Sequence, residues 1–377
     1  MPCLNEADTL EICVRKAQRA MNEHGIPGEV IVADNGSDDS SVEIARRLGA
    51  RVVHVEGRGY GNALMGGIAA ARGRFILMGD ADDSYDFLEL PRFVARLREG
   101  FDLVQGCRLR SGGGTVLPGA MPPLHRLVGN PLFTGMARRM FRVPIHDAYC
   151  GLRAFSRELY ERLGLRCTGM EFAIEMLVKA SLRHEKLAEV PVTLHPDGRK
   201  SHGPHLRTFR DGWRTVRFFL LHSPRWLFLI PGGSLIALGL LGYLLALPGA
   251  VVLGVRFDAH TLLVSSLALL LGYQAILFAL FAKTFGIAEG LLPEDPRVTR
   301  FFEVVYLERG LLAGGSATLL GLGLLTSVAL EWQASGFGDL SYARTMRWVV
   351  PGVTLSALGF QTVLSSFLVS ILGMGRR

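Results

Sequence analysis

A cluster of carboxylates, Asp80-Ala81-Asp82-Asp83, directly follows the apolar run 74–79. That run has the length and composition of a buried strand, so the carboxylates are expected where the strand emerges from a sheet. Carboxylate oxygens are hard ligands that suit Mg2+ or Mn2+, and two of them one residue apart can hold an ion that also binds phosphate. Acidic pairs are also common in solvated turns, so this spacing indicates a metal and diphosphate site only together with the rest of the chain.

Strand-like runs alternate with helix-like stretches in the first part of the chain. The strand-like runs are Glu29–Ala33, Arg51–Val55, Arg74–Met78 and Asp102–Gln105. The helix-like stretches are Asp8–Glu23, Asp39–Leu48, Asn62–Arg72 and Phe87–Leu97. This alternation predicts an α/β domain with a mostly parallel sheet covered by helices. In such sheets ligands bind beyond the carboxyl ends of the strands, where the Asp80 cluster falls.

Two further motifs lie at strand ends, 34–39 (Asp-Asn-Gly-Ser-Asp-Asp) and the glycine-rich run 56–62. The glycine-rich run is not a dinucleotide fingerprint, because G-x-G-x-x-G starting at Gly57 needs a glycine where the chain has Asn62. It remains a turn whose amides and Arg58 can approach a phosphate, with a helix N-terminus behind it. A purely structural tight turn explains the glycines nearly as well.

The composition changes near Trp226, and four long apolar stretches follow. They lie at approximately 227–254, 261–282, 310–330 and 348–372. Each reaches the roughly 20 residues that a helix needs to cross a bilayer. The sequence therefore predicts an integral membrane protein with a four-helix membrane domain. The chain opens without a basic-then-apolar leader, so we expect the domain before the spans to stay in the cytoplasm.

The charges of the loops predict an orientation. The connection after the second span and the tail are basic: Lys283, Arg297, Arg300, Arg309, Arg376 and Arg377. The first connection offers only Arg256. By the positive-inside rule, both chain ends face the cytoplasm of a multi-pass protein in the cell (inner) membrane. The third connection, with Arg344 and Arg347, fits this orientation less well.

The formal charge of +7 could suggest nucleic acid, but the basic residues concentrate in 199–225, at the entry to the membrane. We therefore expect no nucleic-acid partner. On a helix, one stripe of this segment is basic: Arg207, Arg210, Arg214 and Arg217. An apolar stripe that includes Trp213 lies beside it, as in helices that lie in the headgroup layer. The alternative is a basic helix packed on its own domain.

Five motifs occur in an order and spacing that are specific to one family. They are Pro2-Cys3-Leu4-Asn5-Glu6, Asp34-Asn35-Gly36-Ser37, Gly59-Tyr60-Gly61-Asn62-Ala63, Asp80-Ala81-Asp82-Asp83 and Asp147-Ala148-Tyr149-Cys150-Gly151-Leu152-Arg153. Together they resemble family 2 glycosyltransferases with a GT-A fold, above all the polyprenyl-phosphate branch that includes dolichol-phosphate mannose synthase and bacterial polyprenyl-phosphate glucosyltransferases. The resemblance covers about residues 1–225. It divides the chain into a GT-A domain at 1–198, a basic juxtamembrane segment at 199–225 and a membrane domain at 226–377.

The resemblance implies transfer of a sugar from a nucleotide-diphosphate sugar to an undecaprenyl- or dolichyl-type phosphate, with inversion. It implies a donor-binding set: Pro2, Asn5, Glu6, Asp34, Arg58, Asp80, Arg199 and Lys200. Glu6 and Asp34 match residues that hold the base and ribose. Arg199 and Lys200 match a basic loop over the bound diphosphate. A homo-oligomer remains possible under this reading.

The same resemblance implies the metal and the catalytic groups. Asp82 matches the direct ligand of Mg2+ or Mn2+, and Asp80 a contact to ribose or to metal-bound water. Asp147 and Arg153 match a D-x-x-x-G-x-R segment that closes the pocket beside sugar and acceptor, so Asp82, Asp147 and Arg153 are the candidate catalytic residues. Where several relatives supply a glutamine after the D-x-D, this chain has Ser84, a shorter ligand.

Glu171 and Glu175 look like the family's acidic helix near the acceptor, and at i and i+4 they share a face. Salt bridges to Arg166 or Lys179 on the surface are the alternative. A same-fold enzyme with a hydroxyl acceptor would predict a Q-x-x-R-W-type motif after Asp147, which the chain lacks. A membrane scaffold without catalysis is a third reading, and the intact acidic and basic positions count against it.

The first strand is expected to be incomplete as the chain is written. In the family, the motif that begins at Pro2 normally follows about five apolar residues, whereas here only Met1 precedes it. Unpaired backbone groups inside a parallel sheet would each cost on the order of 1–3 kcal/mol. The expected explanation is a start placed too late, and the alternative is a real truncation.

Overall fold

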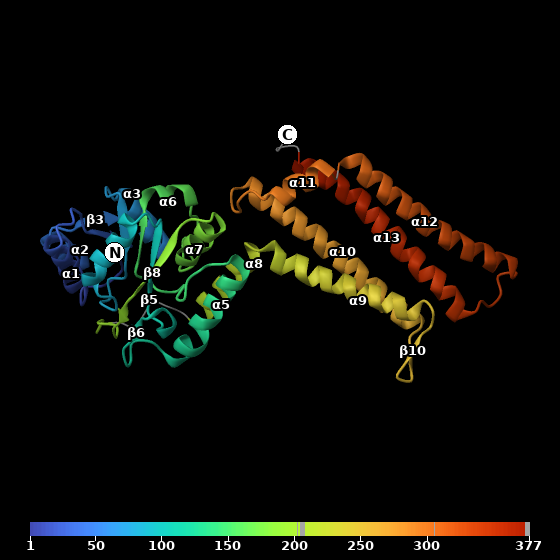
Figure 1. Ribbon diagram of the computed structural model, residues 1–377, viewed down its shortest axis with the longest axis horizontal. Coiled ribbons are helices and arrows are strands. Elements are labelled where there is room, and N and C mark those ends of the chain that lie inside the picture. The colour runs from blue at the N-terminus through green and yellow to red at the C-terminus, as the bar shows by residue number, and fades with distance from the viewer. Residues whose placement is uncertain (202, 204–207, 305, 374–377) are drawn as a thin grey trace. The chain divides into compact units, whose positions relative to one another are not determined.

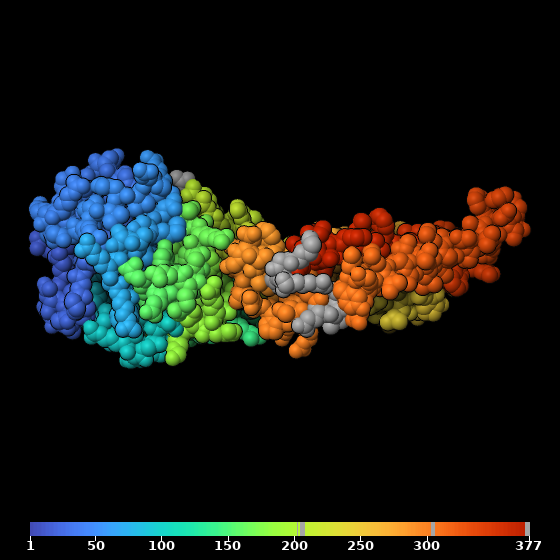
Figure 2. All heavy atoms as spheres, turned by 90° about the horizontal axis from the view of Figure 1, so that it is seen from above, coloured from blue at the N-terminus to red at the C-terminus, as the bar shows by residue number. Residues whose placement is uncertain are grey.

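The computed structural model describes residues 1–201, 203, 208–304 and 306–373. The chain forms two compact units, Met1–Phe219 and Leu220–Arg377 (Figure 1). The first unit includes most of the basic segment predicted to be separate at 199–225. Within this unit, the blue N-terminal segments and the green later segments pack side by side (Figure 2).

Two main sheets form the framework of the first unit. The first has the order β1-β2-β3 and is parallel, with β1 at Pro2–Cys3, β2 at Ile31–Asp34 and β3 at Arg51–His54. The second has the order β4-β7-β5-β8, with β4 at Phe75–Met78, β7 at Arg153–Ser156, β5 at Leu103–Cys107 and β8 at Leu187–Pro191. A short parallel pair joins β6 (Thr115–Val116) to β9 (Thr193–Leu194).

Helices connect and cover these strands. In the first half of the unit they are α1 (Leu10–Glu23), α2 (Ser41–Arg47), α3 (Tyr60–Ala70) and α4 (Leu90–Arg98). In the second half they are α5 (Asn130–Phe141), α6 (Arg157–Leu163), α7 (Phe172–Leu182) and α8 (Thr208–Leu221). The predicted alternation of strands and helices is therefore confirmed, with boundaries that differ by a few residues.

The antiparallel strand β7 brings a distant motif to the predicted site. It lies between β4 and β5 and runs against both, so that Arg153 is opposite Met78 on one side and Gln105 on the other. Because β7 runs in the opposite direction, its first residue lies at the carboxyl ends of its two neighbours. The motif 147–153 and the Asp80 cluster therefore meet at one edge of the sheet.

The first strand is two residues long. Pro2 pairs with Ala33 and Cys3 with Asp34, and the Met1 amine donates to the carbonyl of Ile31 at 2.9 Å. Among the described residues no ladder joins β1 to β4, and the strands form two sheets instead of one.

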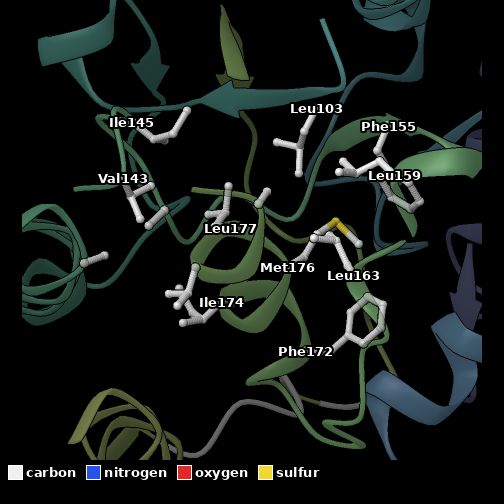
Figure 3. Packing of buried hydrophobic residues seen from close by; sticks show 14 of the residues in the cluster. Leu103, Val143, Ile145, Phe155, Leu159, Leu163, Phe172, Ile174, Met176 and Leu177 are labelled. Atoms are coloured by element: carbon white, nitrogen blue, oxygen red, sulfur yellow. The ribbon is translucent and has the colours of Figure 1, made fainter. Parts of the chain in front are cut away.

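The largest buried cluster lies around α7, which contacts the second sheet (Figure 3). Its side chains Phe172, Met176 and Leu177 are buried with Leu103 and Phe155 of the sheet. Each such side chain contributes roughly 1.5–3 kcal/mol when it is removed from water. This packing fixes the start of α7, and with it the loop that precedes the helix, against the strands that carry the site.

The second unit contains four helices long and apolar enough to cross a membrane: Arg225–Ala246, Ala259–Ala288, Leu307–Ala334 and Tyr342–Gly373. The first includes the π-turn η4 (Arg225–Leu229) and α9 (Ile230–Ala246), and the others are α10, α12 and α13. A further helix, α11, spans Pro296–Val304. The four predicted spans are confirmed.

The end predicted for the first span, at 254, is wrong. The helix ends at Ala246: Leu247 still has helical dihedral angles, and Gly249, with a left-handed φ of 69°, turns the chain. The residues up to 256 form a hairpin of β10 (Val251–Val252) and β11 (Val255–Arg256).

The two arginines that fit the positive-inside rule less well are both paired with acidic residues. Arg347 lies 3.5 Å from Asp258, and Arg344 lies 3.8 Å from Glu331. Because the rule counts Lys and Arg and not net charge, these pairs do not remove the two exceptions, and the orientation stays a prediction.

Candidate active site

The Asp80–Ser84 loop leaves β4 and is held by its own hydrogen bonds. The backbone amide and the hydroxyl of Ser84 both donate to Oδ1 of Asp82. The hydroxyl of Thr9, the residue directly before α1, donates to the carbonyl of Ala81 at 2.6 Å. Ser84 thus orients Asp82, and the other carboxylate oxygen, Oδ2, is turned toward Arg199 at 3.4 Å.

Asp80 is the carboxylate of the pair whose ionisation is opposed by its surroundings. Burial and then the charge of Asp82 raise the pKa of Asp80 to about 6, while a hydrogen bond from the Tyr60 hydroxyl, 2.9 Å from Oδ1, opposes the rise. Its other oxygen abuts Gly151, where a Cβ atom would lie 2.5 Å away. A buried carboxylate whose ionisation is opposed, next to a second carboxylate, forms a site that a bound cation would stabilise.

We expect Asp80→Asn to stabilise the ligand-free protein. A folded pKa of about 6 exceeds the roughly 3.9 of an unfolded aspartate, so the folded state binds the proton more tightly. Stability is therefore lost as pH rises through the window between these values. Thermal unfolding of the purified protein should show a gain on the order of 1 kcal/mol at about pH 7.5 and a smaller gain at about pH 4.5, near the lower end of this window. A gain of equal size at both values would contradict the shift.

The segment 195–201 lies over these carboxylates. Its amides donate back to the loop, from His195 to the carbonyl of Ser84 at 2.9 Å and from Gly198 to that of Asp82 at 3.0 Å. The backbone amides of Lys200 and Ser201 donate to Asp8, each at 2.9 Å. The basic segment predicted to cover the diphosphate is therefore fastened at the D-x-D loop and at the start of α1.

Arg199 is the cation at the centre of the site. Its guanidinium donates to both oxygens of Glu6, at 2.7 and 2.9 Å, and the two side chains are 8% and 5% exposed. It also pairs with Asp197 at 3.0 Å. Glu6, Asp82 and Arg199, which the sequence predicts as parts of one site, are thus brought together across 193 positions of the chain.

Asp34 lies at the end of β2 and is 4% exposed. Although burial opposes ionisation, hydrogen bonds from Ser37 and His54 hold the pKa of Asp34 below its usual value. The Ser37 amide and the His54 ring each lie 3.0 Å from the carboxylate. Asn5 stabilises the same turn, because its side-chain oxygen accepts a hydrogen bond from the Asp38 amide at 2.9 Å. Asp34 is therefore an ionised acceptor in a preformed turn.

The glycines of the glycine-rich turn are explained by close packing. A Cβ atom at Gly59 would lie 2.5 Å from the carbonyl oxygen of Thr168, and one at Gly61 would lie 2.3 Å from that of Cys167. The Asn62 amide donates to Thr168 at 3.2 Å. The structural explanation of these glycines is thus supported, while Arg58 is exposed on the same turn.

Asp147 is fully buried and is bound by Arg108, a residue that the sequence did not single out. The guanidinium donates to both carboxylate oxygens, at 2.8 and 2.9 Å, and the Arg108 amide donates to Oδ2 at 3.0 Å. The predicted contact between Asp147 and an acceptor would require this pair to open. Arg153 is also fully buried, and it donates to the carbonyls of Ala173 and Cys150.

Glu175 is buried in α7 and does not lie on the surface as the alternative required. It pairs with Lys179 at 2.7 Å and accepts from the backbone amides of Arg166 and Cys167. It therefore shapes the loop that packs on the glycine-rich turn. Glu171, at the start of the helix, is only half-buried, and its Oε2 is buried without a hydrogen-bond partner among the described residues.

Two residues to which the sequence assigned no role of their own, Asn35 and Tyr85, connect the parts of the site. The Asn35 amide group binds the carbonyls of Val55 and Gly57 and accepts from Gly59, which pins the glycine-rich turn. The Tyr85 hydroxyl accepts from the Gly151 amide at 2.8 Å. The position of Asn35 directly after a strand end is a signal that could have found it.

Comparison with known proteins shows the family of the chain. Residues 1–164 match the family model "Glycosyl transferase family 2", and residues 280–373 match "Glycosyltransferase family 2 C-terminal transmembrane region". The low-salt glycan biosynthesis hexosyltransferase Agl6 of Haloferax volcanii is 40% identical over 99% of this chain and 88% of its own. The chain belongs to family 2 glycosyltransferases with a C-terminal transmembrane region, and it is a membrane-bound glycosyltransferase.

Two further similarities each cover part of this chain, whose first unit, Met1–Phe219, is called the catalytic unit below. A dolichyl-phosphate hexose transferase of Haloferax volcanii is 36% identical over 44% of this chain and 68% of its own. Glucosyl-3-phosphoglycerate synthase of Mycobacterium tuberculosis, solved with Mn2+, uridine diphosphate and glucosyl-3-phosphoglycerate, is 26% identical with a TM-score of 0.47. That similarity covers 58% of this chain and 76% of the solved one.

Proposed function

We propose that this glycosyltransferase moves a hexose from a nucleoside-diphosphate sugar to a polyprenyl phosphate, with inversion at the anomeric carbon. The observation that carries the proposal is the meeting of Asp80, Asp82 and Arg199 at the end of β4, where two carboxylates and a guanidinium suit a cation and a diphosphate. The four spans and the similarity to a dolichyl-phosphate hexose transferase support a lipid acceptor.

The residues fit Mg2+ or Mn2+ that is shared with the donor. Within the described residues no group of three or more acidic, histidine or cysteine side chains could hold an ion by itself. Mg2+ is usually bound by one or two carboxylates together with substrate phosphates and water, and Asp82 with Asp80 supplies that set. When bound, such an ion would neutralise charge on the departing diphosphate.

The protein's own groups then hold two anions close together. A phosphate acceptor already carries its negative charge, so the site requires no strong general base. We assign Arg199 and the exposed Arg58 to the donor's phosphates, and Asp34 to hydrogen bonds from its base or ribose. Lys200 extends the same cationic segment. Glu175 binds the backbone of the loop at Arg166 and Cys167, so Glu171 is the one of the two predicted glutamates that we keep on the acceptor side.

Arg199→Gln should have opposite effects on two affinities. Without nucleotide, the guanidinium competes with a divalent ion for Asp82 and Glu6, so its loss should raise Mn2+ affinity several-fold. With Mn2+ present, loss of a charged donor to the diphosphate should weaken UDP or GDP binding about tenfold.

Calorimetric titration of the full chain measures both affinities, and Arg199→Lys, which keeps the charge, is the control. If the two affinities change in the same direction, Arg199 does not exchange partners between carboxylate and diphosphate.

We further propose that both chain ends and the catalytic unit face the cytoplasm of the cell membrane. The basic second connection supports this orientation. Helix α8, with Arg210, Arg214 and Arg217 on its exposed side, then lies in the headgroup layer, while Arg207 lies outside the described residues. The boundaries at 198 and 225 and a possible homo-oligomer remain predictions.

The experiment is transfer of label to lipid. The purified full chain is incubated with Mg2+ or Mn2+, undecaprenyl or dolichyl phosphate, and radiolabelled UDP-glucose, GDP-mannose or UDP-N-acetylglucosamine. Label in the lipid phase with one donor supports the proposal, and an acid-labile product is expected of a glycosyl phosphate. Transfer only to a hydroxyl-bearing glycolipid would replace the acceptor proposed here.

A further inference from the structure

Three polar side chains lie in one row across the second sheet. Arg153 of β7 is opposite Gln105 of β5, and Gln105 is opposite Glu189 of β8, which lies beside β5 (Figure 1). Residues at the same register position of neighbouring strands share a face of the sheet. Gln105 and Arg153 are fully buried, and the side chain of Glu189 is 14% exposed. We call Gln105 and Glu189, to which the sequence assigned no role, the β5–β8 clamp.

The β5–β8 clamp binds the backbone of the turn 146–150. Oε1 of Glu189 accepts from the His146 amide at 2.7 Å and from the Asp147 amide at 3.2 Å. The side-chain amide of Gln105 donates to the Asp147 carbonyl at 3.2 Å. Because a carbonyl oxygen only accepts, this partner also fixes the orientation of the Gln105 amide group. The backbone of Asp147 is therefore held by its amide from β8 and by its carbonyl from β5.

Arg153 binds the same turn from the third strand of the row. Its guanidinium donates to the Cys150 carbonyl at 3.1 Å, and the Gln105 side chain donates to that carbonyl at 2.8 Å. The next residue, Gly151, lies against Asp80, because a Cβ atom at Gly151 would be 2.5 Å from Oδ2 of that carboxylate. Movement of the turn would therefore move the backbone that contacts the D-x-D loop.

Stability alone does not account for this polar row. All five residues of β5 are buried, and strands that are buried on both faces are usually apolar. Among the described residues, Oε1 of Gln105 and Nε of Arg153 are buried without a hydrogen-bond partner. A buried polar atom without a partner destabilises the fold. An apolar row would contain no such atoms, so holding the turn is the role that these contacts support.

We propose that Gln105 and Glu189 are positioning residues for sugar transfer. They fix the backbone of Asp147 while Arg108 binds its carboxylate, so the turn keeps one arrangement beside the D-x-D loop. Transfer depends on such an arrangement, because small displacements of groups around the reacting atoms lower the rate steeply. The inference rests on the function proposed above, since positioning is measured by its effect on turnover.

Three variants of the full chain test the β5–β8 clamp. Glu189→Met removes the acceptor of two backbone amides, Gln105→Met removes the donor to two carbonyls, and Glu189→Gln keeps an acceptor oxygen. The matched control is Glu185→Met. Glu185 lies just before β8, pairs with Arg162 at 3.0 Å and has a side chain that is 15% exposed. For each protein we would measure kcat, the donor KM, nucleotide affinity with Mn2+ and the Tm.

Both clamp-breaking variants, Glu189→Met and Gln105→Met, should lower kcat about tenfold to a hundredfold, with the donor KM and nucleotide affinity within about twofold of the wild type. Glu189→Gln should restore kcat to within about threefold, because its amide oxygen can accept from the same two amides. Glu185→Met should keep kcat within about twofold even if its Tm falls as far as that of Glu189→Met. Normal kcat in both clamp-breaking variants, or a fall that matches the loss of folded protein, overturns the proposal.

Hydrogen exchange in peptides covering 146–150 separates this inference from the proposed function, because it needs no substrate. The amides of His146 and Asp147 should exchange at least about tenfold faster in Glu189→Met than in the wild type or in Glu185→Met. Unchanged exchange overturns the β5–β8 clamp itself. If the wild type transfers no sugar from any donor, the proposed function fails and the role in transfer fails with it, whereas faster exchange would still show that Glu189 holds the turn.

Discussion

Asp82→Asn is expected to lower sugar transfer by at least about a thousandfold while the protein stays folded. Asn keeps an oxygen that can accept from Ser84, so the loop should retain its shape. It removes the charge that would hold a divalent ion against the diphosphate, a contribution of several kcal/mol to the barrier. Turnover at saturating donor and metal measures the effect, and Mn2+ binding by calorimetry should be weakened in parallel.

The matched control is Asp83→Asn, one residue further along the chain. Asp83 pairs with Lys16 at 2.9 Å and has a left-handed φ of 58°, which Asn tolerates. It makes the same change of charge beside the site without altering the D-x-D pair, and we expect activity within about twofold of the wild type. Near-normal turnover of Asp82→Asn would remove Asp82 from the metal site.

Arg108→Met is expected to destabilise the catalytic unit by about 3–5 kcal/mol, because it leaves the buried charge of Asp147 without its partner. The double variant Arg108→Met with Asp147→Leu should recover much of this loss, since no unpaired charge then remains. Thermal and denaturant unfolding of the purified chain measure both changes. The exposed Arg110→Met is the control and should change stability by less than about 0.5 kcal/mol.

The result also bears on the role of Asp147. If Arg108→Met unfolds within about 1 kcal/mol of the wild type, the Asp147 carboxylate has reached water, and it is then available to an acceptor as the sequence predicts. A large loss supports a carboxylate that positions the 147–153 segment through Arg108.

Much of the framework could be predicted from the sequence. The strands β2 to β5 are apolar runs between turn residues. The four spans are recognisable because each is an apolar stretch long enough to cross a bilayer as a helix. Strand β7 could not be predicted, because its four residues have no pattern of their own and are placed by pairing with β4 and β5. It is the one strand of the second sheet that runs antiparallel to its neighbours β4 and β5.

The sequence names the residues of the candidate site but not the contacts between them. Asp80, Asp82 and Asp34 follow strands, so the chain itself places them at one edge of the framework. The pairs Arg199 with Glu6 and Arg108 with Asp147 join residues 193 and 39 positions apart, and local spacing contains no trace of them. The same holds for Glu175, whose burial follows from the packing of α7 and not from its i,i+4 partner.

The register of β7 has a consequence for motion during the reaction cycle. Since Arg153 is hydrogen-bonded into the ladder between Met78 and Gln105, the ends of three strands form one rigid block. Opening and closing must then come from the surrounding segments 57–62, 166–169 and 195–201, which are held by side-chain and scattered backbone hydrogen bonds and not by a strand ladder. In hydrogen–deuterium exchange, amides of the block should exchange at the slow rate of global unfolding, and those of the three loops by faster local opening that donor binding suppresses.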